Sequence, residues 1–279
     1  MRTIDTSILT DRVREMCRPL AMELPADVKA CLEVARSAEN CTTAVSVLGD
    51  ILDNADLADR ESIPMCQDTG AAVVFLEVGL DVHFNSDPYA AINEGIRQGY
   101  EKYYLRKSVV ADPLRRVNTG DNTPAFINTK LVPGDKVKIT LMAKGFGSEN
   151  MSRLKMLMPA DGRQGVHDFV LETVSMAGPN ACPPFMVGVG IGGTFDQVAL
   201  AAKRSLLRNL DSKHEDTYYA EFESQLLHDI NQLGVGPQGF GGRTTALAVA
   251  IEALPTHIAG LPVAVNIQCH AIRHQEEII

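Results

Sequence analysis

The stretch Pro184–Leu210, PFMVGVGIGGTFDQVALAAKRSLLRNL, contains an apolar run, a glycine-rich turn and an amphipathic segment in direct succession. The run Pro184–Gly193 is short, apolar and bounded by proline and glycine, which predicts a buried strand. The segment Thr194–Leu210 repeats apolar residues at spacings of three and four, which predicts a helix. A buried strand that passes through a glycine turn into a helix is typical of α/β proteins.

Outward from this stretch, helical and strand patterns are mixed along the whole chain. Helical spacing is found at residues 6–24, 25–40, 42–61, 87–105, 161–178, 215–234 and 247–254. Short runs rich in β-branched residues predict strands at 71–79, 136–145 and 261–268. The predicted fold class is therefore α/β, with mixed helices and strands in one large domain, residues 1–279, and a helical N-terminal lobe at about 1–60.

The overall composition restricts the kinds of partner that the protein can have. The 279 residues are 45% hydrophobic and 22% charged, which is ordinary for a globular protein, and their formal net charge is −9. This negative charge argues against a general affinity for nucleic-acid phosphates or anionic membranes. The sequence has no long apolar run that could span a bilayer and no apolar signal-peptide core at its start. We therefore expect a cytoplasmic protein that binds neither nucleic acid nor membrane.

The six cysteines fall into two groups by their surroundings. Three are in or beside helical segments, where a free cysteine is most often a small core residue: Cys17, Cys31 and Cys41. The other three are in loops next to strands: Cys66, Cys182 and Cys269. Three thiolates on separate loops could hold an iron–sulfur cluster and leave its fourth iron open. The gaps between them match no compact Cys-x-x-Cys site, so spacing alone leaves a structural role open as well.

A glycine motif supplies a different interpretation. Gly188, Gly190 and Gly193 satisfy G-x-G-x-x-G after a strand and before a helix, with Asp211 further along the chain. In outline this is the fingerprint of a dinucleotide-binding site. Asp211, however, follows a helix and not a second strand. The pattern therefore favours a glycine turn that lets a helix approach its strand or a ligand.

Histidine and arginine residues add further candidates. Cys269, His270 and His274 could ligate zinc, but the chain has no second Cys or His cluster at a usable spacing. Arg106 and Arg243 are both in loops and could bind a carboxylate, because a guanidinium presents two N–H groups that match the two carboxylate oxygens.

Taken together, the loop motifs resemble a known family. In chain order they are CQDTG, RKSVVADPL, NTGDNTPA, KGFGSENMSRLKMLMPADG, ACPPFMVGVGIGGT and GVGPQGFGGRTTALAVAIEALPTHIAGLPVAVNIQCHAIRH. They are similar to the α-subunit, or N-terminal half, of class I iron–sulfur fumarate hydratases, a family that includes the L(+)-tartrate dehydratase α-subunit. The resemblance runs from about Ile63 to His274, and the first 60 residues carry no comparable signature.

The resemblance implies a cofactor, a reaction and a set of site residues. It implies a [4Fe–4S] cluster held by Cys66, Cys182 and Cys269. The reaction implied is the reversible hydration of fumarate to (S)-malate, with the open iron as Lewis acid. The positions that look like substrate contacts are Gln67, Asp68, Arg106, Gly147 and His257. Among these, Asp68 and His257 are the expected catalytic residues.

The resemblance also implies a partner chain. The sequence ends at Ile279, where single-chain relatives would continue into a second, swivelling domain. We therefore expect a separate β-subunit that supplies the remaining base, and an (αβ)₂ assembly. L(+)-tartrate or a related dicarboxylate is the alternative substrate, although the loops GFGSENMSRLKML and NTGDNTPAF favour fumarate. A cluster-binding sensor subunit without chemistry and a nucleotide-binding protein are the alternatives from other classes.

Overall fold

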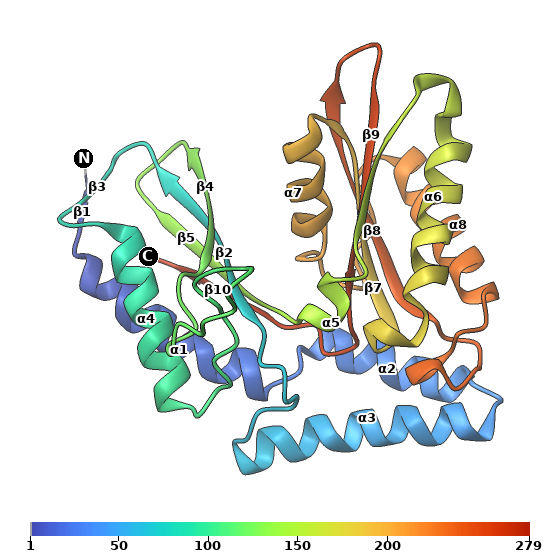
Figure 1. Cartoon of the computed structure of the whole chain (residues 1–279), viewed down its shortest axis with the longest axis horizontal. Coiled ribbons are helices and arrows are strands. Elements are labelled where there is room, and N and C mark those ends of the chain that lie inside the picture. Colours follow the sequence, from blue (N-terminus) through green and yellow to red (C-terminus); the bar gives the residue numbers. More distant parts are fainter. Residues whose placement is uncertain (1) are drawn as a thin grey trace. The chain divides into compact units, whose positions relative to one another are not determined.

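The computed structural model describes residues 2–279 and contains both helices and strands (Figure 1). The α-helices are α1 (Thr6–Met22), α2 (Ala26–Ala38), α3 (Thr42–Glu61), α4 (Pro88–Lys102), α5 (Phe146–Glu149), α6 (Gly162–Ala177), α7 (Phe195–Ser205) and α8 (Thr217–Gln232). The strands are β1 (Arg2–Ile4), β2 (Ala71–Gly79), β3 (Val82–Phe84), β4 (Phe126–Val132), β5 (Val137–Lys144), β6 (Arg153–Leu157), β7 (Phe185–Gly193), β8 (Ala246–Thr256), β9 (Leu261–Gln268) and β10 (His274–Ile278). Three 3₁₀ turns complete the described elements: η1 (Pro159–Asp161), η2 (Gly178–Ala181) and η3 (Pro237–Gly239). The predicted α/β class is confirmed, and no helix among residues 2–279 is long and apolar enough to cross a membrane.

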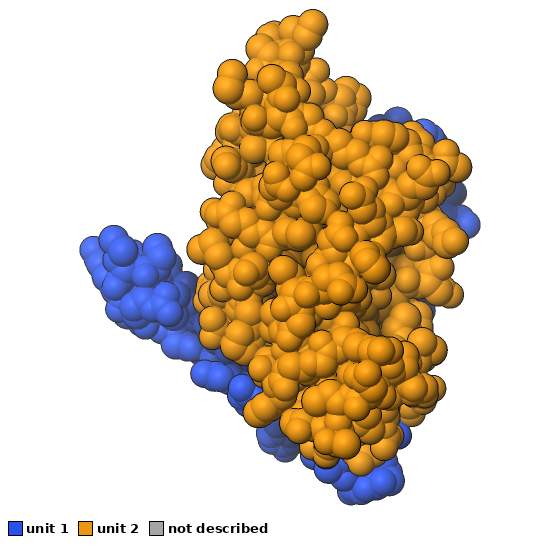
Figure 2. All heavy atoms as spheres, turned by 90° about the vertical axis from the view of Figure 1, so that its right-hand side faces the viewer, with its two compact units in different colours: residues 1–25, 54–146, 273–279 blue, residues 26–53, 147–272 orange. Residues whose placement is uncertain are grey.

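The chain divides into two compact units, which Figure 2 shows in different colours. Unit 1 comprises residues 1–25, 54–146 and 273–279, and unit 2 comprises residues 26–53 and 147–272. The chain therefore passes four times from one unit to the other. The three helices of the N-terminal segment are divided between the units: α1 belongs to unit 1, α2 belongs to unit 2, and the boundary falls within α3.

Unit 1 is built on a four-stranded sheet in the order β10-β5-β2-β4. β2 is parallel to β4, and β5 runs antiparallel to both β2 and β10. Helices α1 and α4 pack together and bury apolar side chains such as Val13 and Ile96 in one core with Val74 of β2. The two helices can approach closely because α4 has a glycine at the contact: a Cβ on Gly95 would lie 2.7 Å from the carbonyl oxygen of Thr10.

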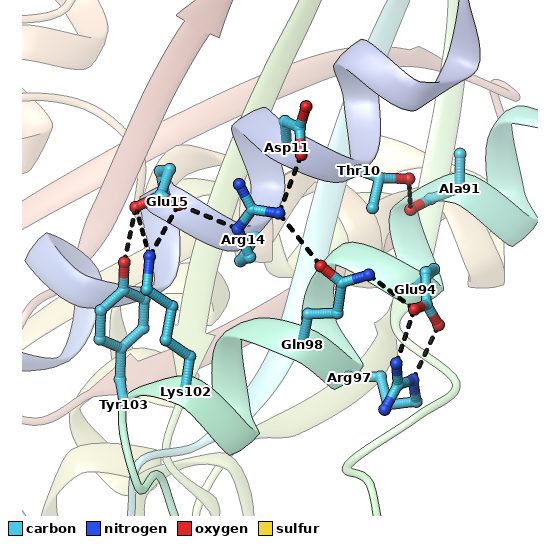
Figure 3. Close-up of polar contacts among 10 residues, drawn as sticks. All are labelled: Thr10, Asp11, Arg14, Glu15, Ala91, Glu94, Arg97, Gln98, Lys102 and Tyr103. Atoms are coloured by element: carbon cyan, nitrogen blue, oxygen red, sulfur yellow. Dashed lines mark hydrogen bonds and ion pairs between the residues drawn. The ribbon is translucent and has the colours of Figure 1, made fainter.

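Polar side chains link α1 and α4 along the exposed edge of their contact (Figure 3). Arg14 donates to the side-chain oxygen of Gln98 at 3.1 Å, and Glu15 accepts from Tyr103 at 2.6 Å and from Lys102 at 3.0 Å. The hydrogen bonds from Tyr103, Lys102 and Arg14 lower the pKa of Glu15 to about 2. Because these groups are largely solvated, we expect each pair to contribute little to stability.

Unit 2 is built on a second four-stranded sheet, in the order β6-β9-β7-β8, that carries helices on both faces (Figure 1). Helix α7 covers one face, where Ala202 packs against Ala264 of β9. Helices α6 and α8 cover the other face, where Val170 and Leu226 share a core with Val187. β7 lies in the middle of this sheet and is buried at every position, as the sequence predicted.

The segment 247–254, which the sequence predicted to be helical, is instead part of strand β8. It pairs in parallel with β7, from Phe185 opposite Ala246 to Gly193 opposite Thr256. Alanine, leucine and glutamate favour helices. A short, mostly apolar run also has no polar face that would distinguish the 3.6-residue period of a helix from the two-residue period of a strand. Pairing with β7 and burial between helices decide in favour of the strand.

The G-x-G-x-x-G motif serves the packing of α7 on β7. A methyl group on Gly188 would overlap the backbone carbonyl oxygen of Ala202, and one on Gly190 would overlap that of Val198. Both glycines lie within β7, and Asp211 follows α7 without an intervening strand. The motif therefore does not have the strand context of a dinucleotide-binding site.

A histidine joins helices α6 and α8 and makes unit 2 sensitive to pH. His167 Nε2 lies 2.8 Å from Asp229 Oδ2, and its Nδ1 lies 3.2 Å from Asp168 Oδ1. Burial alone would lower the pKa of His167, but the hydrogen bonds to Asp229 and Asp168 outweigh it and raise the pKa above its usual value of 6.5. Protonated His167 therefore stabilises the folded unit below about pH 6.5, and this contribution is lost as the pH rises through the raised pKa.

We expect the free energy of unfolding of unit 2 to fall by roughly 0.5 to 1 kcal/mol as the pH is raised from about 6 to about 8. The midpoint of urea denaturation should fall with it. The His167→Gln variant keeps one hydrogen bond to Asp229 but cannot titrate. Its urea midpoint is therefore expected to change less with pH over the same range. Circular dichroism at a series of pH values measures both curves. Equal slopes for the two proteins would show that His167 does not contribute.

Candidate functional site

Cys182 and Cys269 lie at the same end of the unit 2 sheet. Met186 of β7 pairs with Gln268 of β9, so the start of one strand lies beside the end of the other. Cys182 is shortly before β7, and Cys269 directly follows β9. The N–H of His270 donates to the carbonyl oxygen of Cys182 at 3.3 Å, which brings the two cysteine loops into contact.

Local backbone geometry displays the thiol of Cys182. The residue ends the turn η2 in a left-handed conformation, with φ 53°, and its N–H donates to Pro179 O at 3.1 Å. Its side chain is exposed, although cysteine is usually among the most buried residue types. The turn therefore presents Cys182 outward and does not use it for packing.

Gln238 of η3 connects the two cysteine loops a second time. Its backbone N–H and its side-chain amide both donate to Pro183 O at 2.9 Å, and the same amide lies 3.1 Å from His270 Nδ1. His270 Nδ1 also lies 3.1 Å from Cys182 O. The sequence did not single out Gln238, because a polar residue between Pro237 and Gly239 is what an ordinary turn contains.

Gly147 lies at this same end of unit 2. A Cβ at this position would be 3.6 Å from the carbonyl oxygen of Asn180, two residues before Cys182. Glu149, two residues after Gly147, anchors the segment. Its carboxylate pairs with Lys203 of α7 and accepts a hydrogen bond from Asn266 of β9 at 2.9 Å. Gly147, Cys182 and Cys269 thus form one group, which we call the unit 2 site.

His257 lies at the other end of the same sheet. It directly follows β8, whose last residue, Thr256, pairs with Gly193 at the end of β7. The cysteines are at the beginning of β7, and a nine-residue strand at roughly 3.3 Å per residue separates the two ends by more than about 20 Å. His257 is exposed, and its Nδ1 accepts from the N–H of Ala259 at 3.2 Å. Within one copy of unit 2, His257 is not part of the unit 2 site.

The turn from Cys66 to Gly70 forms the corresponding group in unit 1. The Cys66 thiol is partly exposed and lies 3.4 Å from Gln67 Oε1. Asp68 fixes the turn with both carboxylate oxygens: Oδ1 accepts from Gly70 N–H at 3.0 Å, and Oδ2 accepts from Phe146 N–H at 2.9 Å. The guanidinium of Arg273 donates to the carbonyl oxygen of Asp68 at 3.2 Å.

Arg106 lies beside this turn. The hydroxyl of Thr69 donates to the carbonyl oxygen of Arg106 at 3.0 Å, while the Arg106 side chain is exposed. The structure therefore brings Cys66, Gln67, Asp68 and Arg106 together, and we call these four residues the unit 1 site. Arg243, the other candidate cation, is in unit 2, where its N–H donates to the buried carboxylate of Glu39 at 2.6 Å.

The exposure of the cysteines separates Cys17 from the other five, because Cys31 and Cys41 are partly exposed, as Cys66 and Cys269 are. None of the six forms a disulfide in the described part of the chain. Cys17 is fully buried, and this burial raises its pKa to about 12, so it is an inert core thiol. Burial and the nearby Asp27 and Asp211 also raise the pKa of Cys31. The three loop thiols, Cys66, Cys182 and Cys269, are partly or fully exposed.

This donor set fits an iron–sulfur cluster, because such clusters are held by accessible cysteine thiolates and a backbone hydrogen bond already joins the loops of two of the three cysteines, Cys182 and Cys269. Among residues 2–279, no three His, Cys, Asp or Glu side chains lie close enough together to form a metal-binding group. The zinc interpretation of Cys269, His270 and His274 is therefore not supported.

Comparisons with known proteins cover almost the whole chain. Residues 10–277 match the family described as fumarate hydratase (Fumerase). A protein of Methanocaldococcus jannaschii named putative L(+)-tartrate dehydratase subunit alpha is 42% identical over 273 residues, which are 95% of each chain. The L(+)-tartrate dehydratase subunit alpha of Escherichia coli strain K12 is 32% identical over 269 residues, which are 95% of this chain and 88% of the relative. The family predicted from the loop motifs is confirmed: this chain belongs to the fumarate hydratase (Fumerase) family.

Proposed function

We propose that this chain is the cluster-binding α-subunit of a two-chain iron–sulfur hydro-lyase that acts on a four-carbon dicarboxylate. The family match over residues 10–277 supports the reaction class. The observation that carries the assignment of the cofactor is the hydrogen bond from His270 to Cys182 O, which holds two of the three expected cysteine loops together. Cys182 is exposed, although cysteine is usually among the most buried residue types, and a ligand role accounts for this placement.

In this proposal Cys66, Cys182 and Cys269 hold a [4Fe–4S] cluster. When bound, the cluster supplies an open iron that acts as a Lewis acid toward a substrate hydroxyl or carboxylate. The reaction involves no net oxidation or reduction of the substrate, because it only adds or removes water. The cluster would therefore not need to transfer electrons.

The residues of the unit 1 site supply binding and orientation. Arg106 binds one substrate carboxylate through its guanidinium, which also stabilises the negative charge that develops there when a proton is removed from the adjacent carbon. Asp68 already accepts two backbone hydrogen bonds, but each carboxylate oxygen can accept a further one. Asp68 therefore orients a proton-transferring group, while the exposed amide of Gln67 contacts the substrate. Gly147, without a side chain, leaves room in the unit 2 site.

His257 contributes to the reaction only in an assembly. Since it lies at the opposite end of the sheet from Cys182 and Cys269, contact with the substrate requires His257 from a second copy of the chain. The relatives are named as alpha subunits, which supports a separate β-subunit as the partner. We infer an (αβ)₂ assembly in which the β-subunit provides the remaining base.

Two substrates are proposed for the same chemistry. Fumarate, giving (S)-malate, is favoured by the loops 118–126 and 145–157, which look closer to the fumarate-hydratase pattern. L(+)-tartrate, which loses water to give oxaloacetate, is favoured by the names of the relatives. Both belong to one reaction class, reversible water addition or loss next to a carboxylate.

The test is reconstitution without air. The chain is purified anaerobically, loaded with iron and sulfide, and mixed with its β-type partner; fumarate is followed by its ultraviolet absorbance and oxaloacetate by a coupled NADH assay. We expect turnover of at least one of the two substrates that depends on both chains. A protein that remains colourless after loading would exclude the cluster, and an intact cluster without turnover would favour the sensor interpretation.

A further inference from the structure

We propose that Asn122 is a positioning residue that holds the loop of Arg106 against the cysteine turn of unit 1, and thereby sets the affinity for the substrate carboxylate. This inference rests on the proposed function of Arg106. Asn122 is in the loop before β4, 14 residues after Ser108 and 52 residues after Gly70.

Asn122 is completely buried and uses both ends of its side-chain amide. Its oxygen accepts from the N–H of Ser108 at 2.7 Å and from the N–H of Val109 at 3.2 Å. Its nitrogen donates to the carbonyl oxygen of Gly70 at 3.3 Å. Since the Ser108 and Val109 amides are in an irregular loop, their binding to Asn122 replaces the ladder hydrogen bonds that a strand would provide.

Two further contacts stabilise this junction between the Arg106 loop and the segment Thr69–Gly70. The hydroxyl of the buried Tyr100 donates to Gly70 O at 2.9 Å, so this oxygen accepts from two side chains. On the other side of Arg106, Thr69 donates to the Arg106 carbonyl at 3.0 Å. Arg106 is thus held at its own carbonyl and again two residues later at Ser108, and both tethers lead to the segment Thr69–Gly70.

The backbone of Asn122 is also specific. Its φ is 64°, in the left-handed region that asparagine and glycine tolerate better than other residues. A change to glycine therefore removes the side-chain tether without adding backbone strain. A change to alanine removes the tether and also adds strain. Asn122→Asp keeps the acceptor for Ser108 and Val109 and loses the donor to Gly70 O, so it is the conservative variant.

A displaced guanidinium no longer meets both carboxylate oxygens and therefore binds the carboxylate less well. Misplacing a positioning group by about 1 Å can cost on the order of a hundredfold in rate. In the assembled, cluster-loaded αβ enzyme we expect Asn122→Gly to raise KM for the dicarboxylate about tenfold, with kcat reduced less and the cluster absorbance unchanged. Asn122→Asp is expected to recover part of the loss. Asn128→Ala, which removes a partly buried asparagine side chain from the neighbouring β4, serves as the matched control and is expected to leave KM unchanged.

A double-mutant cycle with Arg106→Ala tests whether Asn122 acts through Arg106. If it does, Asn122→Gly has little further effect on KM in the Arg106→Ala background, because the group that it positions is already absent. Additive losses would overturn the proposal and indicate a general structural role.

Hydrogen exchange of the isolated chain provides a readout that does not depend on the proposed reaction. We expect the amides of Ser108 and Val109 to exchange faster in Asn122→Gly than in the wild type, while amides of β2 and β5 keep their protection. Unchanged exchange would overturn the tether itself. If exchange accelerates but the wild-type αβ enzyme turns over neither substrate, the tether stands and the proposed function fails; if the wild-type enzyme is active and KM does not change, the positioning role fails.

Discussion

Cys66→Ser, Cys182→Ser and Cys269→Ser are each expected to remove the iron–sulfur absorbance and to lower the activity of the αβ enzyme by at least about a hundredfold. An open metal ion contributes several kcal/mol to transition-state stabilisation, and each 1.4 kcal/mol corresponds to about a tenfold change in rate. Iron content, visible absorbance and turnover of anaerobically prepared enzyme measure the effect. All three variants should still fold, because none of these thiols is fully buried.

The matched controls are serine replacements of the cysteines outside the loops. Cys31 and Cys41 are partly exposed, and their replacement is expected to leave iron content and turnover unchanged. Cys17→Ser places a hydroxyl in the α1–α4 contact and is expected to lower stability while the cluster is retained. Loss of iron in both sets to the same extent would show that loop context does not identify the ligands.

Gly190→Ala is expected to destabilise unit 2 strongly. The added methyl group would overlap the backbone oxygen of Val198, which cannot move without shifting α7 on the sheet. Forcing extra atoms into a packed core costs typically 1 to 3 kcal/mol, and a rigid backbone neighbour places this case at about 3 kcal/mol or above. The melting temperature is expected to fall by roughly 6 to 12 °C, measured by circular dichroism or calorimetry.

Gly260→Ala is the corresponding control, because the atoms nearest to its added methyl group would be 3.9 Å away, at ordinary contact distance. We expect its melting temperature to match that of the wild type. The pair also distinguishes the two interpretations of the G-x-G-x-x-G motif. If Gly190 were present for a phosphate, Gly190→Ala would retain its stability and lose a nucleotide affinity that the wild type possesses.

Long periodic segments and buried strands could be predicted from the sequence, whereas short or polar strands could not. Residues 71–79 and 261–268 were predicted at the bounds that β2 and β9 have, because both are apolar and bounded by turn residues. β4 was missed because most of its side chains are exposed and it is held by pairing with β2 alone. β10 was missed because its polar sequence, HQEEI, becomes a strand only through β5.

Candidate site residues could be recognised in the sequence where their own side chain has a distinctive chemistry, and not where their contacts to other segments give them their place. Cysteines in loops are unusual enough to be noticed, and Arg106 has a chemistry that suits a dicarboxylate. Asn122 and Gln238 are ordinary turn residues by sequence, and their roles depend on segments far away in the chain. His257 precedes Cys269 by a single strand, but the antiparallel course of β9 carries the two to opposite ends of the sheet.

The division of unit 1 among three separate stretches has a consequence for the order of synthesis. On the ribosome, α1 and β2 emerge early, whereas β10, which completes their sheet at the edge of β5, is made only after residues 147–272 of unit 2. Arg273, which supports the turn of Asp68, emerges together with β10. Unit 1 therefore cannot complete its fold until residues 273–279 have been made, although nearly all of its other residues have been translated by residue 146. Folding of this half of the protein can finish only after the whole of unit 2 has been synthesised, and loss of residues 273–279 acts directly on it.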